Sequence, residues 1–419
     1  MTRETTGFIS KPHRPELLMP GGSLELLKTA VNYGADAVYI GDESMSLRAA
    51  ARNFSVSEIR EGVEYAHERG KKVYIAANIF AHNEDLPKAM KLFLQLKSIM
   101  PDGLIISDPG VFNLARSLVP EIPVHISTQA NNTNFSTYDF WYKMGVRRVV
   151  SARELTLSEI RQIRENIPDD MEIESFVHGA MCISYSGRCL ISSFLTGRDA
   201  NRGACTHPCR WSYSLMEESR PGEYMPVFED GRGTYLYHSR DLCMIEHIPE
   251  LISAGIDSFK IEGRMKNALY LAIVTAAYRR AIDDYLESPE KYEESRPEYL
   301  SEILKTGNRT FCTGFYFGNP GAEAQVYENS KNHTEYIYLG TVFTEKGRPY
   351  FIQKNKFSVG DEIEVLRPFS APVRARVISL ETEEGEPVMS APHASQRLYP
   401  TLDIGLEDYD VMRMPQKQI

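Results

Sequence analysis

Short apolar runs alternate with longer amphipathic stretches along the first two thirds of the chain. Each run is rich in Val, Ile, Leu, Phe or Tyr and lacks a regular alternation of apolar and polar positions, as is typical of strands that are buried on both faces. The runs lie at residues 16–20, 37–41, 73–78, 103–107, 124–127, 148–152, 173–178 and 258–262. We expect each of these eight runs to form a parallel strand.

The stretches between these runs have the periodicity of helices. Apolar residues within 85–100 recur at a spacing close to the helical repeat. Ser55 precedes Glu58 by the three residues of a capping box, which can close a helix N-terminus. Thr156 and Glu159 have the same spacing. The pattern therefore predicts helices at 56–69, 85–100, 157–166 and 269–286.

The alternation of strands and helices predicts the fold class. Such a pattern indicates an α/β protein with a parallel sheet and right-handed crossovers. Eight strand–helix units in about 270 residues fit a (β/α)8 TIM-like barrel, which is our prediction. An open doubly wound sheet is the alternative, because it has the same alternation of elements.

One connection is much longer than the others, and it divides the chain. A cysteine-rich insertion at 180–250 follows strand seven on the side where barrel enzymes place their chemistry. We predict a barrel over 1–286 that includes this insertion, a linker or extension over 287–330, and a small all-β, barrel-like domain over 331–419. The β-like runs of that last domain lie at 334–342, 348–353, 362–366, 373–378 and 401–405.

Charge and composition exclude several classes of protein. The chain has 419 residues, with 47 Lys and Arg against 57 Asp and Glu, so it is not built for general nucleic-acid binding. An RNA contact would need a local basic patch. No apolar run approaches the roughly 18–20 residues of a membrane span, and residues 1–15 lack the apolar core of a secretory signal. We expect a cytoplasmic protein without a membrane partner.

Five of the six cysteines lie in the insertion, at positions 182, 189, 205, 209 and 243. Buried structural cysteines do not explain this crowding, because a turn-rich insertion offers little core. The close pair Cys205 and Cys209 would suit structural zinc, whereas the wider spacing of the others favours an iron–sulfur cluster. Redox or catalytic thiols are a third interpretation.

A longer pattern surrounds the first two of these cysteines. It consists of Glu174, Phe176, Gly179, Ala180, Met181, Cys182, Gly187, Cys189 and Ser192. In this pattern the segment resembles the signature of the collagenase-like peptidases of unknown catalytic type. Further stretches that are similar to this family lie at 15–18, 127–134, 202–205, 241–243 and 260–264. The resemblance therefore covers essentially the whole chain.

The resemblance implies one of two kinds of activity. The family takes its name from an attributed peptidase activity, whereas its better understood branches are hydroxylation proteins that carry a 4Fe-4S cluster. One branch makes 5-hydroxyuridine at the wobble position of tRNA and depends on prephenate, and others act on ribosomal RNA or in oxygen-independent ubiquinone synthesis. The length and the appended β-domain are most similar to the tRNA branch. This implies an oxidoreductase of the tRNA uridine hydroxylase type.

The resemblance also implies ligands and partners. The family spacing assigns the cluster to Cys182, Cys189, Cys205 and Cys243. Some relatives use a close pair, which would put Cys209 in the place of Cys243. The implied partners are the anticodon loop of tRNA, the iron–sulfur assembly machinery and a homologous subunit, with prephenate as co-substrate.

Four arginines make the insertion locally basic in this acidic chain. Between residues 179 and 216 these are Arg188, Arg198, Arg202 and Arg210, interleaved with aromatic residues. Guanidinium groups bind phosphates, and aromatic rings stack on unpaired bases. The predicted RNA contacts are Arg188, Arg202 and Arg210. For any single arginine, a solvated surface position is the alternative.

Polar residues at the carboxyl ends of the predicted strands are the remaining candidates, because barrel enzymes build their sites there. They are Asn78, Asp108, His125, Gln129, Arg153, Glu154, His178, Lys260, Glu262 and Arg264. The predicted catalytic residues are His125, His178, Arg153 and Glu262, with the histidines handling protons. The predicted substrate contacts are Asn78, Gln129, Lys260 and Arg264. A dicarboxylate such as prephenate would bind Arg153, Lys260 or Arg264. For each of these residues, the alternative to a role in the site is a structural role as a helix cap or as a member of an ion pair.

A peptidase is the alternative enzyme class. The sequence has no His-Glu-x-x-His helix and no Gly-x-Ser-x-Gly turn. A Cys–His dyad is conceivable, with His178 or His207 near Cys182 or Cys205, but thiolates committed to iron cannot serve as nucleophiles. Hydroxylation of another RNA or of a small molecule is a further alternative. A non-catalytic RNA-binding or iron–sulfur scaffold is the third class, which a closed apolar barrel mouth would favour.

Overall fold

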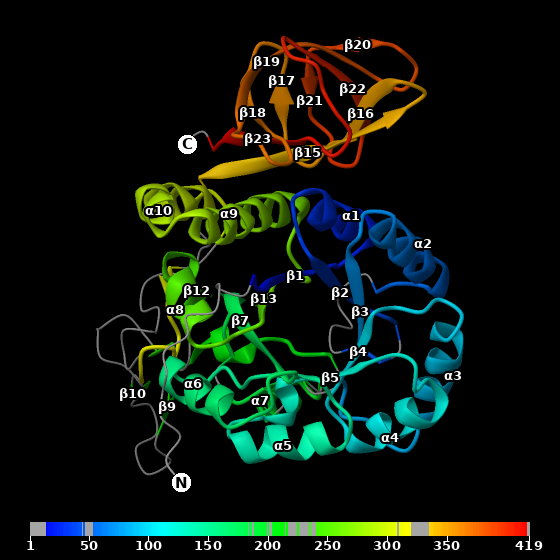
Figure 1. The fold of residues 1–419 in the computed structure, drawn as a ribbon. Coiled ribbons are helices and arrows are strands. Elements are labelled where there is room, and N and C mark those ends of the chain that lie inside the picture. Colours follow the sequence, from blue (N-terminus) through cyan, green and yellow to red (C-terminus); the bar gives the residue numbers. More distant parts are fainter. Residues whose placement is uncertain are drawn as a thin grey trace.

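Eight strands close a parallel barrel, which confirms the predicted TIM-like fold (Figure 1). The strands are β1 (Glu16–Pro20), β2 (Ala37–Gly41), β3 (Lys72–Ala77), β4 (Gly103–Ile106), β5 (Val124–Ile126), β6 (Arg148–Val150), β7 (Glu172–Ala180) and β13 (Ser258–Ile261). Each of β1 to β7 pairs in parallel with the next, and β13 pairs with both β7 and β1. These last two pairings leave the barrel without an open edge.

The computed structural model describes most of the chain. The described residues are 14–43, 45–46, 53–182, 184–186, 188–198, 200, 203–213, 215–216, 224–225, 234–235, 240–307, 310–319 and 335–416, with only the main chain described at 194, 210, 212–213, 215–216, 224–225 and 234–235. Among the described residues, no helix is both long and apolar enough to cross a membrane.

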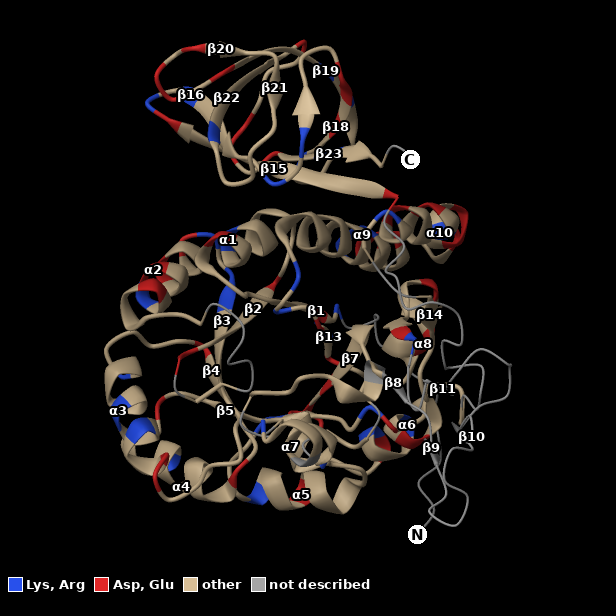
Figure 2. Cartoon of the chain, turned by 180° about the vertical axis from the view of Figure 1, so that it is seen from behind, with Lys and Arg blue, Asp and Glu red and all other residues tan. Residues whose placement is uncertain are grey.

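A ring of helices surrounds the barrel (Figure 2). Its members are α1 (Leu24–Asn32), α2 (Val56–His67), α3 (Leu86–Leu96), α4 (Pro109–Leu118), α5 (Phe135–Lys143), α6 (Leu157–Glu165), α8 (Ile248–Ser253) and α9 (Ala268–Glu287). Both predicted capping boxes are formed. The Ser55 side chain accepts from the main-chain N–H of Glu58, whose carboxylate accepts from the N–H of Ser55. The pair at the start of α6 repeats this exchange.

The amino end of the barrel is filled by charged side chains that pair with one another. We call Glu16, Tyr74, Arg148, Glu172 and Glu174 the amino-end layer. Arg148 lies 2.5 Å from Glu16 and 2.6 Å from Glu172, and the Tyr74 hydroxyl donates to Glu16 at 2.6 Å. Burial alone would raise the pKa of Glu16, but Arg148 and the donated hydrogen bonds hold it below its ordinary value. The layer therefore keeps its charges in the interior because they are paired.

The insertion begins where β7 runs on past its barrel neighbour β6. The end of β7 pairs antiparallel with β12 (Asp241–Cys243), which pairs in parallel with β14 (Phe311–Cys312). Gly179 in this extension has φ +106, and a Cβ there would lie 2.4 Å from the main-chain oxygen of Glu262. Glycine fits both conditions. The further elements described here are α7 (Ile191–Thr196), η3 (Pro208–Arg210), β8 (Ser212–Tyr213), β9 (Leu215–Met216), β10 (Tyr224–Met225), β11 (Thr234–Tyr235) and η4 (Ile245–His247).

The charged stretch within the predicted linker forms a helix, α10 (Pro289–Leu304), packed against α9. Its buried residues Tyr292, Tyr299 and Ile303 are seven and four positions apart, which places them on one helical face. The Tyr299 hydroxyl donates to Asp284 of α9 at 2.6 Å. The many charged residues of this stretch therefore lie on the solvent-facing side of α10.

An antiparallel all-β region follows at the carboxyl end of the chain. Its strands are β15 (Tyr336–Glu345), β16 (Arg348–Ile352), β17 (Phe357–Ser358), β18 (Glu362–Leu366), β19 (Val373–Glu381), β20 (Pro387–Val388), β21 (Ser390–Ala391), β22 (Arg397–Leu402) and β23 (Val411–Pro415). The main sheet has the order β18-β23-β15-β16-β22-β19-β20, and an additional β18–β19 pairing curls it round. In place of the strand predicted at 401–405, the structure has β22, which begins and ends earlier. Strand β23 was not predicted.

The β-region sits against the helical ring and away from the open ends of the barrel (Figures 1 and 2). The Tyr33 hydroxyl at the end of α1 donates to the Leu366 oxygen at 2.7 Å. Arg413 of β23 is fully buried, and it pairs with Glu364 at 2.7 Å and with Glu302 of α10 at 3.0 Å. These contacts leave the mouth of the barrel free of the β-region.

Candidate functional site

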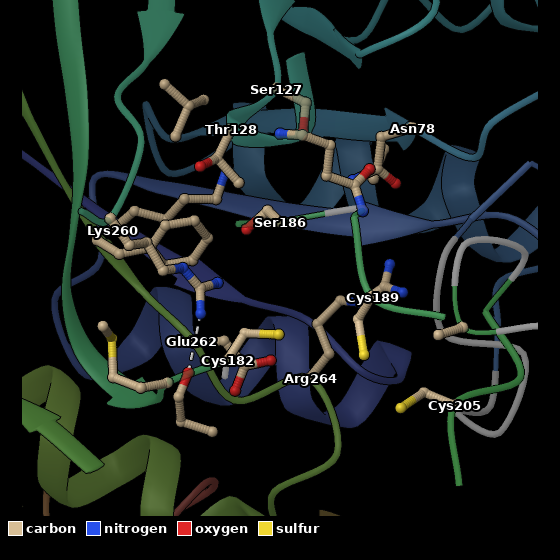
Figure 3. Close-up of a pocket in the computed structure, with 18 of the residues that line it drawn as sticks. Asn78, Ser127, Thr128, Cys182, Ser186, Cys189, Cys205, Lys260, Glu262 and Arg264 are labelled. Atoms are coloured by element: carbon tan, nitrogen blue, oxygen red, sulfur yellow. Dashed lines mark hydrogen bonds between the residues drawn. The ribbon is translucent and has the colours of Figure 1, made fainter. Parts of the chain in front are cut away.

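A cavity of about 200 Å³ opens at the carboxyl ends of the barrel strands, between the barrel and the insertion (Figure 3). Its barrel side is lined by Tyr39, Ala76, Asn78, Ile105, Ser127, Thr128, Gln129, Val150, Arg153, Phe176, Lys260, Glu262 and Arg264. Its insertion side is lined by Ala180, Met181, Cys182, Ser186, Cys189, Ala200, Cys205, His207, Pro208 and Cys209. The mouth is thus open and largely polar, and the insertion forms one wall of it.

Four cysteines of the insertion line this cavity, namely Cys182, Cys189, Cys205 and Cys209. Figure 3 shows the first three on the insertion side of the cavity. None of the four forms a disulfide, and no group of three or more His, Cys, Asp or Glu side chains in the described part of the chain is arranged to hold a metal ion. The structure therefore brings four thiols to one cavity without joining them at one point.

Cys243, the remaining cysteine of the predicted set, lies elsewhere. It is buried on β12 opposite His178, and it is absent from the lining of the cavity. Burial raises the pKa of its thiol to about 12, although hydrogen bonds with the Ile245 main chain and with Tyr278 of α9 oppose that rise. In this structure Cys209, the predicted substitute, shares the cavity with the other three cysteines.

Lys260 stands at the floor of the cavity. Its ammonium donates to the fully buried Glu174 carboxylate at 2.6 Å, and it lies 4.6 Å from the ring centroid of Tyr39 and 5.4 Å from that of Phe176. Burial lowers the pKa of Lys260 below its ordinary value, and the Glu174 carboxylate opposes that shift. Lys260 thus connects the amino-end layer with the cavity above it.

Two arginines bring further positive charge to the cavity. Arg153 stacks its guanidinium 3.9 Å from the ring centroid of Phe176 and donates to the Ala180 oxygen at 2.9 Å. Arg264 is buried, donates to the Ser46 hydroxyl at 2.6 Å and passes so close to Gly41 that a Cβ there would lie 2.2 Å from its guanidinium. Both are predicted site residues, and both line the cavity.

The polar segment 127–134 forms the turn after β5 that aims Gln129 at the cavity. Its 3-10 helix η1 (Thr128–Ala130) ends at Asn131, which has φ 55. The Asn131 side chain donates to the Gln129 oxygen at 2.8 Å and to the Ser186 oxygen of the insertion at 3.2 Å. Asn131 therefore ties the barrel rim to the cysteine-rich wall. We had not predicted this role, although the run of amides in the sequence was a signal for it.

Neither predicted catalytic histidine reaches the cavity. His178 lies outside the barrel sheet, where its Nδ1 is 3.4 Å from the Tyr278 hydroxyl and its ring contacts Tyr270 and Phe311. Burial lowers its pKa to about 3. His125 packs edge-on against Tyr74, and burial, with the cations Arg148, Lys260 and Lys72, lowers its pKa well below the ordinary value. Burial thus favours the neutral form of both imidazoles, and neither lines the cavity.

A β-bulge explains the position of His178. Lys260 pairs with Phe176, but the next residue of β13, Ile261, pairs with His178, so two steps on β7 match one step on β13. A bulge of this kind reverses the face on which the following side chains lie. Simple alternation from Glu174 and Phe176 would have put His178 inside the barrel, as we had predicted.

The other predicted residues divide between the cavity and its surroundings. Glu262 lines the cavity, and its main-chain oxygen accepts from the Tyr270 hydroxyl at 2.8 Å. Asp108 caps α4, where its side chain accepts from the Val111 N–H at 2.9 Å, and burial raises the pKa of Glu154. Arg188 is exposed and does not line the cavity. Arg202 and the side chain of Arg210 lie outside the described residues.

Comparison with known proteins now identifies the family. The model described as peptidase family U32 matches residues 22–326, and that of the U32 C-terminal domain matches residues 334–413. The tRNA hydroxylation protein P1 of Bacillus subtilis (strain 168) is 40% identical over 403 residues, or 96% of this chain and 94% of the relative. The tRNA hydroxylation protein P of Escherichia coli (strain K12) is 38% identical over 90% of this chain and 92% of its own.

An archaeal relative bears a different description. It is an uncharacterized protease of Methanocaldococcus jannaschii, 45% identical over 334 residues, which cover 78% of this chain and 80% of the relative. The two family models together cover the barrel from residue 22 onward, the insertion and residues 334–413 of the β-region. The chain therefore belongs to peptidase family U32, the family that its cysteine signature resembles.

Proposed function

We propose that this chain takes part in hydroxylating tRNA, converting the wobble uridine of an anticodon loop to 5-hydroxyuridine. Two relatives that match 90% or more of its length are named tRNA hydroxylation proteins. The observation that carries the proposal is that one cavity at the barrel mouth is lined both by thiols of the insertion and by cationic side chains of the barrel. This combination suits an enzyme that brings a redox group and an anionic substrate together.

The proposed cofactor is a 4Fe-4S cluster, and the donor set of the cavity fits it. Such clusters are held by thiolates from loops that wrap around them, and the cavity offers Cys182, Cys189, Cys205 and Cys209. Cys243 is buried outside the cavity, so we assign the fourth thiolate to Cys209. When bound, the cluster would supply one-electron transfer or hold the insertion in place.

The proposed co-substrate is a dicarboxylate of the prephenate type. Arginine binds carboxylates through parallel hydrogen bonds, and Arg153 and Arg264 both line the cavity. The ammonium of Lys260 is already paired with Glu174, so it positions an anion less strongly than the arginines. These two arginines are therefore the proposed carboxylate contacts.

The proposed RNA contact lies on the solvent side of the same mouth. Tyr185 and Trp211 are exposed on the insertion. Tyr185 directly precedes the lining residue Ser186, and Trp211 follows the lining residue Cys209 by two positions in the sequence. Exposed aromatic rings can stack on unpaired bases of a loop. A wobble base is unpaired in its loop, so turning it into the barrel mouth costs little.

The decisive experiment is nucleoside mass spectrometry of tRNA from a deletion strain that also lacks other members of this family. The wild-type gene should restore 5-hydroxyuridine. Arg153→Met should lower it about tenfold or more, because a charge-assisted contact is lost. Arg374→Met, at an exposed position of β19, is the matched control and should restore it fully. If the deletion leaves 5-hydroxyuridine unchanged, the proposal is wrong.

Proteolysis is the second candidate function, because the relative from Methanocaldococcus jannaschii is described as a protease. The main-chain N–H of His207 donates to the Cys205 thiol at 3.4 Å, and such a contact does not activate a nucleophile. His178 is held behind the barrel sheet, against α9. Purified iron-free protein that cuts denatured collagen would nevertheless favour proteolysis over hydroxylation.

A further inference from the structure

Three polar atoms of cavity-lining side chains are buried without a hydrogen-bond partner. They are Asn78 Oδ1, Gln129 Oε1 and Arg153 Nε. Buried polar groups are nearly always paired, because burying one without a partner is costly. Unpaired groups that meet at one cavity therefore indicate a polar ligand that completes their bonds.

The two carboxamides stand on a fixed main chain. The Ser107 hydroxyl donates to the main-chain oxygen of Asn78 at 3.0 Å, and the Asn131 side chain donates to the main-chain oxygen of Gln129 at 2.8 Å. Asn78 follows β3 and Gln129 follows β5, so both belong to one side of the rim. A ligand group that enters this side meets two neutral carboxamides whose positions are set before it binds.

The size and walls of the cavity favour a small flat ring. Its volume of about 200 Å³ is below the roughly 300–1,000 Å³ of ordinary ligand pockets. Tyr39, Ile105, Val150 and Phe176 supply ring and aliphatic surface. The cationic groups of Arg153 and Lys260 lie over Phe176. The flat faces of a single heterocyclic base fit between these ring and aliphatic walls.

We infer that Asn78 and Gln129 bind the polar edge of a pyrimidine base in this cavity and favour uracil over cytosine. This inference rests on the proposed function and names the residues that select its base. One of the two unpaired carbonyl oxygens can accept from the N3–H of uracil, which lies between the two carbonyl acceptors of the base. The NH2 group of each carboxamide can donate to those acceptors. In cytosine N3 is an acceptor, and it would face a carbonyl oxygen unless the carboxamide turned round.

The inferred role is selection of the base and not proton transfer. Carboxamides do not titrate, so neither residue can act as an acid or a base. A site that forms hydrogen bonds with a polar group of its substrate rejects an analogue that leaves the polar side chains of the site unpaired. Replacing either residue should therefore reduce the preference for uracil while leaving contacts with the RNA backbone intact.

The test measures binding of anticodon stem-loop RNAs to the purified full-length chain. The RNAs carry uridine, cytidine or an abasic ribose at the wobble position. The wild-type chain should bind the uridine loop about tenfold or more tightly than the other two. Asn78→Ala and Gln129→Ala should each reduce that ratio to below about threefold without changing the affinity for the abasic loop. The exposed Asn113→Ala is the matched control and should keep the full ratio.

The outcomes separate this inference from the function on which it rests. A preference for uridine that survives in both variants would overturn the inference and leave tRNA binding intact. If the wild-type chain binds none of the loops better than a plain duplex, the proposed RNA substrate is wrong. Thermal unfolding with uridine 5′-monophosphate then decides the inference. If the nucleotide raises the unfolding temperature of the wild-type chain but of neither variant, the inference that these residues bind the base is supported. If it does not stabilise the wild-type chain, or stabilises the variants equally, the inference is wrong.

Discussion

The two ends of the barrel treat polar groups in opposite ways. At the amino end, Arg148 contacts three carboxylates, and the Tyr74 hydroxyl completes the set. At the carboxyl end, Asn78, Gln129 and Arg153 each keep a buried atom without a partner. The carboxyl-end groups follow strands β3, β5 and β6, and beside the amino-end layer His125, packed on Tyr74, keeps Nδ1 without a partner.

This difference separates stability from function within one sheet. Charges at the amino end already have partners in the free protein, so they leave few bonds for a ligand to complete. Unpaired groups at the carboxyl end lower stability until a partner completes their bonds, and here three of them line one cavity. The same asymmetry is typical of barrel enzymes, whose sites lie at the carboxyl ends of the strands.

The largest expected effect concerns the thiols at the carboxyl end. After anaerobic purification, Cys182→Ala, Cys189→Ala and Cys209→Ala should each lose nearly all bound iron and the brown absorption of a cluster, because each removes a proposed ligand. Cys243→Ala should keep both, because its thiol lies outside the cavity. Iron content and visible absorption measure this directly. Iron that is lost in Cys243→Ala and kept in Cys209→Ala would reverse our assignment of the fourth ligand.

The next effect concerns the amino-end layer. Arg148→Met leaves the buried carboxylate of Glu16 without its main cation and Glu174 with Lys260 alone, and we expect a loss of about 3–5 kcal/mol in the free energy of unfolding. The control is Arg348→Met, which removes an exposed partner of Glu381 and should cost about 0–1 kcal/mol. Urea unfolding measures both. Equal losses would show that the layer does not stabilise the fold as we describe.

Local patterns predicted the fold better than the site. Apolar runs and capping boxes depend on neighbouring residues, so the starts of the eight barrel strands and of α2, α3, α6 and α9 were predicted to within about a residue. Helix α10 was missed because its many charges hide three buried residues on one face. Strand β23 was missed because Arg413 stands in its middle, and the burial of this cation depends on Glu302 from a distant helix.

The site was predicted only where one rule sufficed. Residues after parallel strands meet at one rim, and this rule found Asn78, Gln129 and Lys260. The bulge that turns His178 outward depends on the register between β7 and β13, which the sequence alone does not reveal. The clamp made by Asn131 likewise depends on the position of the insertion.

The buried histidines predict a pH dependence that belongs to the fold and not to the cavity. Because the pKa of folded His178 is about 3 and its ordinary value is 6.5, the unfolded chain binds more protons between these values. Stability should be full above about pH 6.5 and fall as the pH drops, by about 1.4 kcal/mol per pH unit for this residue. Urea unfolding at about pH 7.5 and about pH 5.5 measures the slope.

Two variants assign this slope to its source. His178→Gln should weaken the pH dependence, because Gln does not titrate, whereas His393→Gln, at an exposed position, should leave it as it is. His125, whose pKa is also lowered by burial, should keep part of the slope in both variants. A slope that His178→Gln does not change would mean that this histidine is not buried in its neutral form.

The smallest effect compares two residues that both follow barrel strands. Asp108 follows β4 and caps α4, so Asp108→Ala should cost about 1 kcal/mol of stability and leave the uridine preference of the cavity unchanged. Asn78 follows β3, and its unpaired oxygen gives the fold nothing, so Asn78→Ala should cost less stability than Asp108→Ala and remove the preference. Urea unfolding and RNA binding, measured on both variants, test this crossover. If both variants lose stability and the preference for uridine in the same proportion, the hydrogen-bond pairing of a rim residue does not show whether that residue stabilises the fold or binds the ligand.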